Sequence, residues 1–434
     1  MAVGFTQLLR QNRNYRYLWA GQLVSEIGDH FNNIAVFSLA FATTHSGMVV
    51  SGVMIARAIP VLLAGPLAGV LLDRMDRKRI MMASDLIRMV IALAFILAVS
   101  NHHTWLLYTL SALLMFASPF FTSGRAAILP RITDKDELHT ANSLTQTTQW
   151  VTTTLGAFFG GLSIAQFGYE WGFVLNSLSF LFSGFCVWRL RAPGKDGFRA
   201  QRAVAMNEAN VIKPWHDYRD GLAYMISVPL LTAIATVHIG WATGGGAAQV
   251  LFTLFGEQVF GRGPRGIGEV WGCAGIGLVV GGIIGHRLGP RLTFRAYRWT
   301  IGICYLIHGM AYVIFSLMQN YVLALFFIGL SRASVAVSSV LNYKEVIRHV
   351  PDQYRGRVFA TLETLTWAVM MLSLAGAGVA SSHYSVRSIG VASGLLSSTT
   401  AIFWAWANLV RRMPEPPDFA TDEEVEVHGE SAAH

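Results

Sequence analysis

Twelve apolar stretches, each long enough to cross a lipid bilayer, follow one another from Tyr17 to Val410. A transmembrane helix needs about 20 mostly apolar residues. Backbone groups in lipid must pair with one another, which favours helices over open sheets. We therefore predict an all-α membrane protein, and the long seventh stretch can begin as a segment at the membrane interface. The predicted spans are 17–43, 49–72, 80–100, 104–124, 141–166, 171–190, 222–255, 267–288, 297–317, 321–343, 358–381 and 387–410.

Composition and charge pattern both fit a membrane protein. Charged residues make up 13% of the chain, whereas soluble domains carry about 25%. The net charge of +8 could indicate a nucleic-acid partner, but Lys and Arg cluster in every second loop, for example at 74–79 and 287–298. The opposite loops hold only Arg262, Arg265 and Arg387. This positive-inside pattern predicts cytoplasmic termini and no nucleic-acid partner.

The longest interior polar segment separates six predicted spans from six. Gly69–Arg74, after the second span, is echoed by Gly282–Arg287 after the eighth, and each precedes a basic loop. Repeats of this kind are typical of one large transporter architecture. The chain then divides into a cytoplasmic N-terminal segment (1–16), a six-helix bundle (17–190), a cytoplasmic linker (191–221) and a second, pseudo-symmetric six-helix bundle (222–410). An acidic cytoplasmic tail (411–434), expected to be disordered, follows.

Signals for catalysis or for a bound cofactor are missing from the sequence. Gly244-Gly-Gly246 lies inside a predicted span, outside the strand–turn–helix context of a phosphate-binding loop. Cys186, Cys273 and Cys304 also fall inside spans, and no His/Cys cluster has the spacing of metal ligands. We expect no enzymatic activity, no cofactor and no metal site.

The sharpest motif lies between the second and third predicted spans. It runs Gly69-x-x-x-Asp73-Arg74-x-x-Arg77-Lys78. Positive-inside topology explains its basic residues but not the spacing from Gly69 to Asp73. Gly69 would let two helices approach closely, and Asp73 would accept hydrogen bonds from the N terminus of a neighbouring helix.

This motif resembles the signature of the major facilitator superfamily, G-x-x-x-D-R-x-x-R-[RK]. The second copy departs from it, because His286 replaces the acidic residue. Other stretches are similar to the enterobactin-exporter and macrolide-efflux branch, among them Asn14–Gln22, Ala56–Pro60 and Arg355–Val358. The resemblance implies two six-helix bundles, a central cavity and transport by alternating access.

The resemblance also implies a gate where the second and eleventh spans meet. Glu363 lies early in span 358–381 and is the candidate partner of Arg77. Asp73 is expected against the start of the same span. These contacts would hold the two bundles together only while the cytoplasmic side is closed.

A polar stripe follows the first predicted span. Its members are Gln22, Glu26, Asp29 and Asn33. Steps of four, three and four residues place them on one face of a helix. Carboxylates inside a membrane are costly unless they face a cavity or a partner. We expect proton coupling or cation recognition, above all at Asp29; the alternative is a fixed ion pair that only locks helices.

Arg57 and Arg332 are the other charges deep inside predicted spans. Such an arginine must pair, snorkel or face water. Arg57 could pair with Asp29, and Arg332 could attract an anionic group of a substrate. A permanent ion pair is the alternative for both.

A second polar stripe follows the fifth predicted span. Its members are Asn142, Gln146, Gln149 and Thr153. Such residues can line a wet cavity or join helices by hydrogen bonds. We expect Gln146 and Gln149 to line the path of the substrate, and Trp241 and Trp367 to offer it an aromatic surface.

These features predict a secondary transporter in a bacterial inner membrane. We expect it to act as a monomer that exports a lipophilic or amphipathic small molecule, such as a drug or a siderophore, by proton antiport. A lysophospholipid-type flippase of the same superfamily is one alternative and predicts a laterally open groove. A non-transporting sensor or scaffold is the other and predicts no charge facing a cavity.

Overall fold

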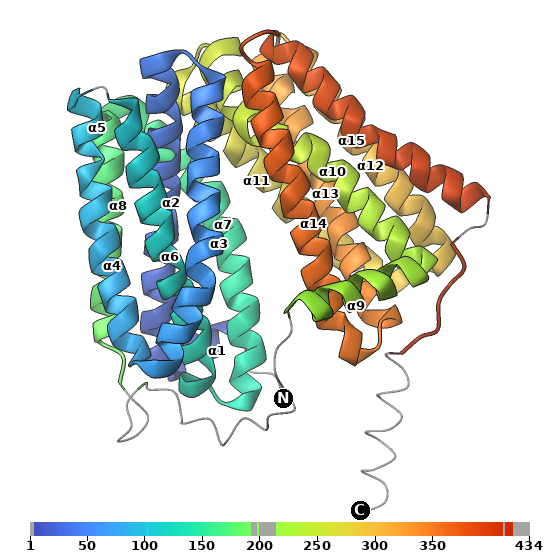
Figure 1. Cartoon of the computed structure of the whole chain (residues 1–434), viewed down its shortest axis with the longest axis horizontal. Coiled ribbons are helices and arrows are strands. Elements are labelled where there is room, and N and C mark those ends of the chain that lie inside the picture. The colour runs from blue at the N-terminus through green and yellow to red at the C-terminus, as the bar shows by residue number, and fades with distance from the viewer. Residues whose placement is uncertain (1–3, 102, 192–197, 199–213, 411–412, 420–434) are drawn as a thin grey trace, which may run out of the picture. The chain divides into compact units, whose positions relative to one another are not determined.

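The computed structural model describes residues 4–101, 103–191, 198, 214–410 and 413–419. The regular elements in these ranges are helices (Figure 1). They are α1 (Phe5–Gln11), α2 (Arg13–Thr44), α3 (Gly47–Arg74), α4 (Arg77–Ala94), α5 (Ile96–Asn101), α6 (Thr104–Ile132), α7 (Lys135–Phe167), α8 (Tyr169–Trp188), α9 (Pro214–Ser227), α10 (Pro229–Leu254), the π-helix η2 (Phe255–Val259), α11 (Gly263–Leu288), the 3-10 helix η3 (Gly289–Arg291), α12 (Phe294–Leu317), α13 (Tyr321–His349), α14 (Asp352–Ala380) and α15 (Val386–Leu409).

Each predicted span has a helical counterpart, and the all-α membrane fold is confirmed. Within the described ranges, nine helices are long and apolar enough to cross a membrane, or ten if the bent pair α9 and α10 counts as one. Helices α2 and α7 are not among them, although they are 32 and 33 residues long. Both carry the polar stripes noted in the sequence, which lower their hydropathy.

The predicted seventh span is broken. Helix α9 ends at Ser227, and the chain from Pro229 continues at an angle of 111° to it. Proline lacks the N–H that a continuous helix would need at that point. Figure 1 shows α9 crossing beside the lower end of α14. The two are joined by an ion pair between Arg357 and Asp220 at 3.2 Å and by stacked rings of Tyr224 and Tyr354.

The chain forms two compact units, which are described separately. Unit 1 comprises 1–205, 250–275 and 378–383; unit 2 comprises 206–249, 276–377 and 384–434. The boundaries at 249/250, 275/276 and 377/378 fall inside α10, α11 and α14, so these helices pass from one unit to the other without a loop. The predicted bundle limits stay a prediction, because most of the 191–221 linker lies outside the described residues.

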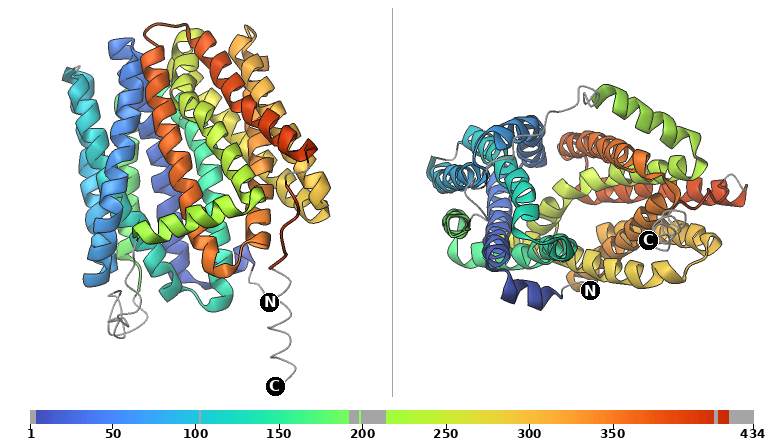
Figure 2. Two further views of the ribbon diagram at one scale, coloured as in Figure 1. Left: turned by 45° about the vertical axis from the view of Figure 1, so that its right-hand side comes forward. Right: turned by 90° about the horizontal axis from the view of Figure 1, so that it is seen from below.

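Unit 1 is built around α2. This helix packs against α7 and α8, while α6 packs against α3 and α4; Figure 2 shows these helices, blue to green, grouped together. A Cβ at Gly28 would lie 2.8 Å from Oδ1 of Asn176, so the glycine permits the close approach of α2 and α8. The short helix α1 inserts Leu8 into the same core, where its side chain is buried.

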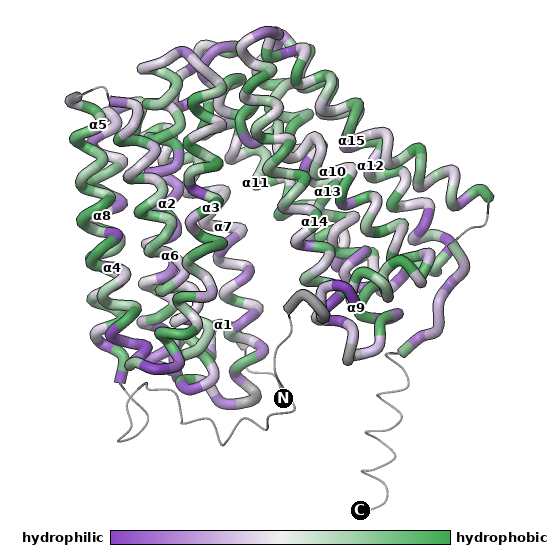
Figure 3. Tube along the Cα trace, viewed as in Figure 1, coloured by the Kyte–Doolittle hydropathy of each residue, from purple (hydrophilic) through white to green (hydrophobic). Residues whose placement is uncertain are grey.

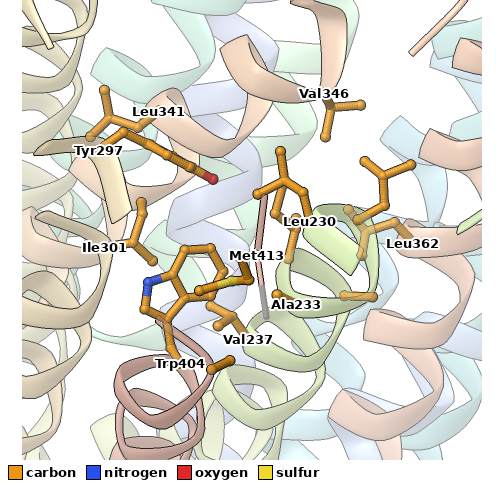
Figure 4. Close-up of a cluster of buried hydrophobic side chains, with 14 of the residues drawn as sticks. Leu230, Ala233, Val237, Tyr297, Ile301, Leu341, Val346, Leu362, Trp404 and Met413 are labelled. Atoms are coloured by element: carbon orange, nitrogen blue, oxygen red, sulfur yellow. The ribbon is translucent and has the colours of Figure 1, made fainter. Parts of the chain in front are cut away.

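The core of unit 2 lies between α10, α12, α13 and α15. Figure 4 shows Leu230, Val237, Tyr297, Ile301 and Trp404 in this cluster. The indole of Trp404 is fully buried and donates a 2.7 Å hydrogen bond from Nε1 to the backbone oxygen of Arg298. The largest aromatic group of the core is therefore also satisfied as a hydrogen-bond donor.

The segment 413–419 packs onto unit 2. Met413 is 1% exposed and belongs to the core cluster of Figure 4. Arg348 binds Asp418 at 2.6 Å, and the N–H of Phe419 donates to the backbone oxygen of Arg348 at 2.9 Å. The expectation of a disordered tail is wrong for 413–419, because an apolar anchor and an ion pair fix it. Residues 411–412 and 420–434 of the predicted tail lie outside the described residues.

Candidate functional site

The predicted polar stripe of α2 begins with a hydrogen-bonded carboxylate, Glu26. Gln22, which is 1% exposed, donates to Oε1 of Glu26 from Nε2 at 2.8 Å. Thr152 of α7 donates to Oε2 at 2.9 Å. Arg125 of α6 forms an ion pair with Oε1 at 3.4 Å, and both side chains are less than a fifth exposed. Glu26 therefore joins three helices of unit 1.

Arg125 was not among the predicted site residues. It follows Gly124, the last residue of predicted span 104–124, and was therefore expected in a loop. Helix α6 instead continues to Ile132, which carries Arg125 into the helical bundle. The signal that could have found it is the apolar run Ala126–Leu129, which follows the arginine directly.

Asp29 lies one turn further along α2 and has different surroundings. Its Oδ1 is buried and accepts no hydrogen bond from any described residue. The predicted pairing of Asp29 with Arg57 stays a prediction: no direct ion pair joins them among the described residues, and amide oxygens accept hydrogen bonds from the guanidinium. Arg57 donates to Oδ1 of Asn32 at 3.2 Å and to Oδ1 of Asn33, and its guanidinium lies 5.8 Å from the ring centre of Phe37.

A second buried charge pair lies on α4. Arg88 and Asp85 form an ion pair, and both side chains are at most 3% exposed. The guanidinium lies 4.7 Å from the ring centre of Phe121 and 4.4 Å from that of Phe180. Two aromatic faces thus lie against a guanidinium that is buried away from water.

The basic loop of the predicted gating motif binds helix ends inside unit 1. Arg77 donates to the backbone oxygen of Ala127 at 2.8 Å. Lys78 donates to the backbone oxygens of Trp188 and Leu190 at 2.7 and 2.8 Å, at the end of α8. Figure 3 shows this loop as the purple lower end of α3 and α4. Lys78 thereby pairs with carbonyls that the end of α8 leaves without an intrahelical partner.

The remaining motif residues lie at the end of α3. A Cβ at Gly69 would meet no described atom within 4 Å, so the expected close approach of a second helix at this glycine stays a prediction. The buried stripe of α3, formed by Ala64, Ala68 and Leu72, faces another direction. Asp73 and Arg74 are exposed. Their contact with the start of α14, like that of Arg77 with Glu363, would join two units and stays a prediction.

The other predicted residues lie apart from this cluster. On α7, Gln146 is exposed and Gln149 is half-buried. In unit 2, Trp241 is half-buried, and its Nε1 has no partner among the described residues. Arg332 is 8% exposed and lies beside His308 and Tyr312. Their substrate roles stay predictions.

Unit 2 contains a pocket of about 310 Å³ that includes two predicted residues. Glu363 and Trp367 of α14 line it. The remaining lining residues come from α10, α13 and α14 and are Ile234, His238, Ser339, Asn342, Tyr343, Val346, Phe359, Leu362 and Thr366. The sequence placed Glu363 at a gate and Trp367 in a cavity, and here they share one surface.

A carboxylate that the sequence analysis missed lies in the π-helix η2. Ser38 of α2 donates from its hydroxyl to Oε1 of Glu257, and the hydroxyl of Tyr169 lies 3.3 Å from that of Ser38. All three residues belong to unit 1. A π-helical turn shifts side-chain directions by one residue, so periodicity along span 222–255 did not indicate where Glu257 would point.

Comparison with known proteins gives one family. Residues 18–345 match the family model described as Major Facilitator Superfamily. The MFS-type transporter YfiS of Bacillus subtilis is 27% identical over 86% of this chain and 88% of its own length. BacE of the same species, named for a proposed role in bacilysin export, is 25% identical over 81% and 84%. Macrolide efflux protein A of Streptococcus pyogenes is 23% identical over 91% and 96%.

Solved structures share the fold. A bacterial homologue of the iron transporter ferroportin has a TM-score of 0.68 at 16% identity, covering 90% of this chain and 98% of its own. A bacterial homologue of the human lysosomal transporter Spinster has a TM-score of 0.66 at 14% identity, covering 92% and 97%. At these identities the likeness concerns the fold alone.

Proposed function

The chain belongs to the Major Facilitator Superfamily, and we propose that it exports a lipophilic or amphipathic small molecule by alternating access, in exchange for protons. It is a multi-pass membrane transporter and not an enzyme. Its place is the bacterial inner membrane with both termini in the cytoplasm, as the distribution of Lys and Arg indicates.

The observation that carries proton exchange is the buried carboxylate of Asp29. Its Oδ1 has no hydrogen-bond donor among the described residues, and the nearby Arg57 is held by the amides of Asn32 and Asn33. Burial disfavours the charged form of a carboxylate. A proton can satisfy Oδ1 without breaking an existing contact. Glu26, in contrast, is already bound by Arg125 and Thr152.

Export is supported by the names of related proteins. Macrolide efflux protein A is named for efflux of macrolides, and BacE is named for export of bacilysin. Their matches extend over most of each chain, so the whole transport unit is compared rather than a fragment. The proposed path lined by amides and aromatic rings suits an amphipathic cargo.

The first test is efflux from a bacterial strain that lacks its own drug pumps. Three probes are loaded: a macrolide, a lipophilic cation and a neutral lipophilic dye. Expression of the protein should lower accumulation of at least one probe, and collapse of the proton gradient should abolish the effect. Accumulation equal to that of the empty vector for all three would contradict export.

The second test asks whether Asp29 couples transport of the probe to movement of protons. Asp29→Asn in proteoliposomes should retain exchange of labelled for unlabelled probe, since that exchange needs no net proton movement. It should lose uphill transport driven by a pH gradient. Glu170→Gln, an exposed carboxylate at the start of α8, is the control and should behave as the wild type. Uphill transport by Asp29→Asn at the wild-type rate would assign coupling to another residue.

A groove in unit 1 favours a second candidate function, lysophospholipid flipping. It has a volume of about 350 Å³ and lies between α4 and α8. Its rim includes Leu86, Leu181 and Trp188, each at least half exposed. Acyl chains fit such an apolar surface. Transfer of a fluorescent lysophospholipid between leaflets of proteoliposomes, lost on Leu181→Gln but not on Asp29→Asn, would support flipping over drug export.

A further inference from the structure

The pocket of unit 2 combines aromatic faces with one carboxylate. Trp367, Tyr343 and Phe359 line it, and the rings of Tyr343 and Phe359 lie 5.0 Å apart. Among the described lining residues, Glu363 carries the only formal charge when His238 is neutral. Aromatic faces and a carboxylate together attract an organic cation.

Glu363 is available to a ligand. Its side chain is exposed, and no hydrogen bond or ion pair joins it to another described residue. The imidazole among the lining residues, that of His238, is held by a 2.8 Å contact between Nδ1 and the backbone oxygen of Ile234. The carboxylate therefore has no cationic partner within the pocket.

An independent observation comes from Asn342 of α13, on the same pocket wall. The residue is 1% exposed. Its Oδ1 accepts a 2.8 Å hydrogen bond from the hydroxyl of Tyr297, which fixes the orientation of the amide. Its Nδ2 has no partner among the described residues. A buried donor without an acceptor is costly, and a ligand oxygen in the pocket would satisfy it.

We infer that this pocket binds a lipophilic organic cation that also carries an oxygen acceptor. The cationic group lies against Glu363 and the ring of Trp367, and the oxygen accepts from Nδ2 of Asn342. The volume of about 310 Å³ is at the small end of the range for ligand pockets, so it holds the charged end of a larger substrate. This inference names the substrate class of the exporter proposed above and rests on that proposal.

The test uses two ions of matched shape and opposite charge on the purified full chain. Tetraphenylphosphonium should bind in a calorimetric titration, and tetraphenylborate should not. Glu363→Gln should weaken phosphonium binding about tenfold, equal to the loss of one favourable charge contact. Trp367→Leu should weaken it as well. Glu170→Gln and Trp105→Leu, both exposed on unit 1, should leave it unchanged.

Lidocaine, an amine with a carbonyl oxygen, tests the contact with Asn342. Asn342→Leu should weaken lidocaine binding and leave phosphonium binding within twofold, which also shows that this variant is folded. Equal binding of the two tetraphenyl ions, or phosphonium binding by Glu363→Gln within twofold of wild type, would overturn the inference. Efflux of a neutral lipophile in the same membranes would then still support export, so the two failures are distinguishable.

Discussion

Glu26 and Asp29 lie one helical turn apart on α2, yet they have different surroundings. Glu26 is bound by Gln22, Thr152 and Arg125, which corresponds to the fixed ion pair considered as the alternative. Asp29 has a buried oxygen without a donor. Sequence spacing could place both on one face, since that depends only on the helical period. It could not assign their partners, because these come from α6 and α7.

The ion pair predicts a defined pattern of stability. Arg125→Gln leaves Glu26 charged and partly buried without its partner, which should cost about 3 kcal/mol. The double variant Glu26→Gln, Arg125→Gln removes both charges and should recover at least half of that loss. Thermal unfolding in detergent measures the difference. A double variant as unstable as Arg125→Gln alone would show that the pair contributes little.

At the scale of elements, hydropathy predicted where helices occur more accurately than the residues at which they end. Span 104–124 stopped before Arg125, although α6 reaches Ile132. The break at Ser227 divides the long seventh stretch, 222–255, and the expected position of its first part at the membrane interface stays a prediction. Close contacts between helices were harder to predict: the sequence analysis singled out Gly69, whereas a close contact within unit 2 lies at Gly281 of α11, which faces Ala333 of α13. Which helix lies opposite a glycine depends on the fold.

Gly281→Ala should therefore destabilise unit 2. The new Cβ would lie 2.7 Å from the carbonyl carbon of Ala333, and overpacking of this kind costs about 1–3 kcal/mol. Gly376→Ala on α14 is the matched control, because nothing described lies within 4 Å of its Cβ. The control should gain up to about 1 kcal/mol from helix propensity. Equal unfolding temperatures of the two variants would argue against a tight contact between α11 and α13.

At the scale of the whole molecule, the sequence predicted the class and the superfamily. Hydropathy, the positive-inside pattern and the Gly69–Lys78 motif were enough for both, because each is a local property of the chain. The pocket around Glu363 was not predicted. It collects side chains from α10, α13 and α14, and no spacing within one helix indicates that they meet.

The predicted gate belongs to this scale. Asp73 at the end of α3 is expected to bind the N terminus of α14 while the cytoplasmic side is closed. Asp73→Asn should weaken that state, and a bias of ~1–2 kcal/mol would change its population about tenfold. Spin labels on α3 and α14 would report a larger share of inward-open molecules. An unchanged distance distribution, or a shift toward outward-open molecules, would exclude Asp73 as the latch.

Three helices that pass between the units without a loop have a mechanical consequence. If the two units move against each other during transport, α10, α11 and α14 would have to bend, because no loop interrupts them at 249/250, 275/276 or 377/378. A glycine stands within four residues of each point, at Gly246, Gly275 and Gly378, where bending is least stiff. Amide hydrogen exchange there should respond to a bound substrate, while the middle of α12 should not. The curvature of these three helices would then differ between the states of the transporter, while proton exchange supplies the driving energy.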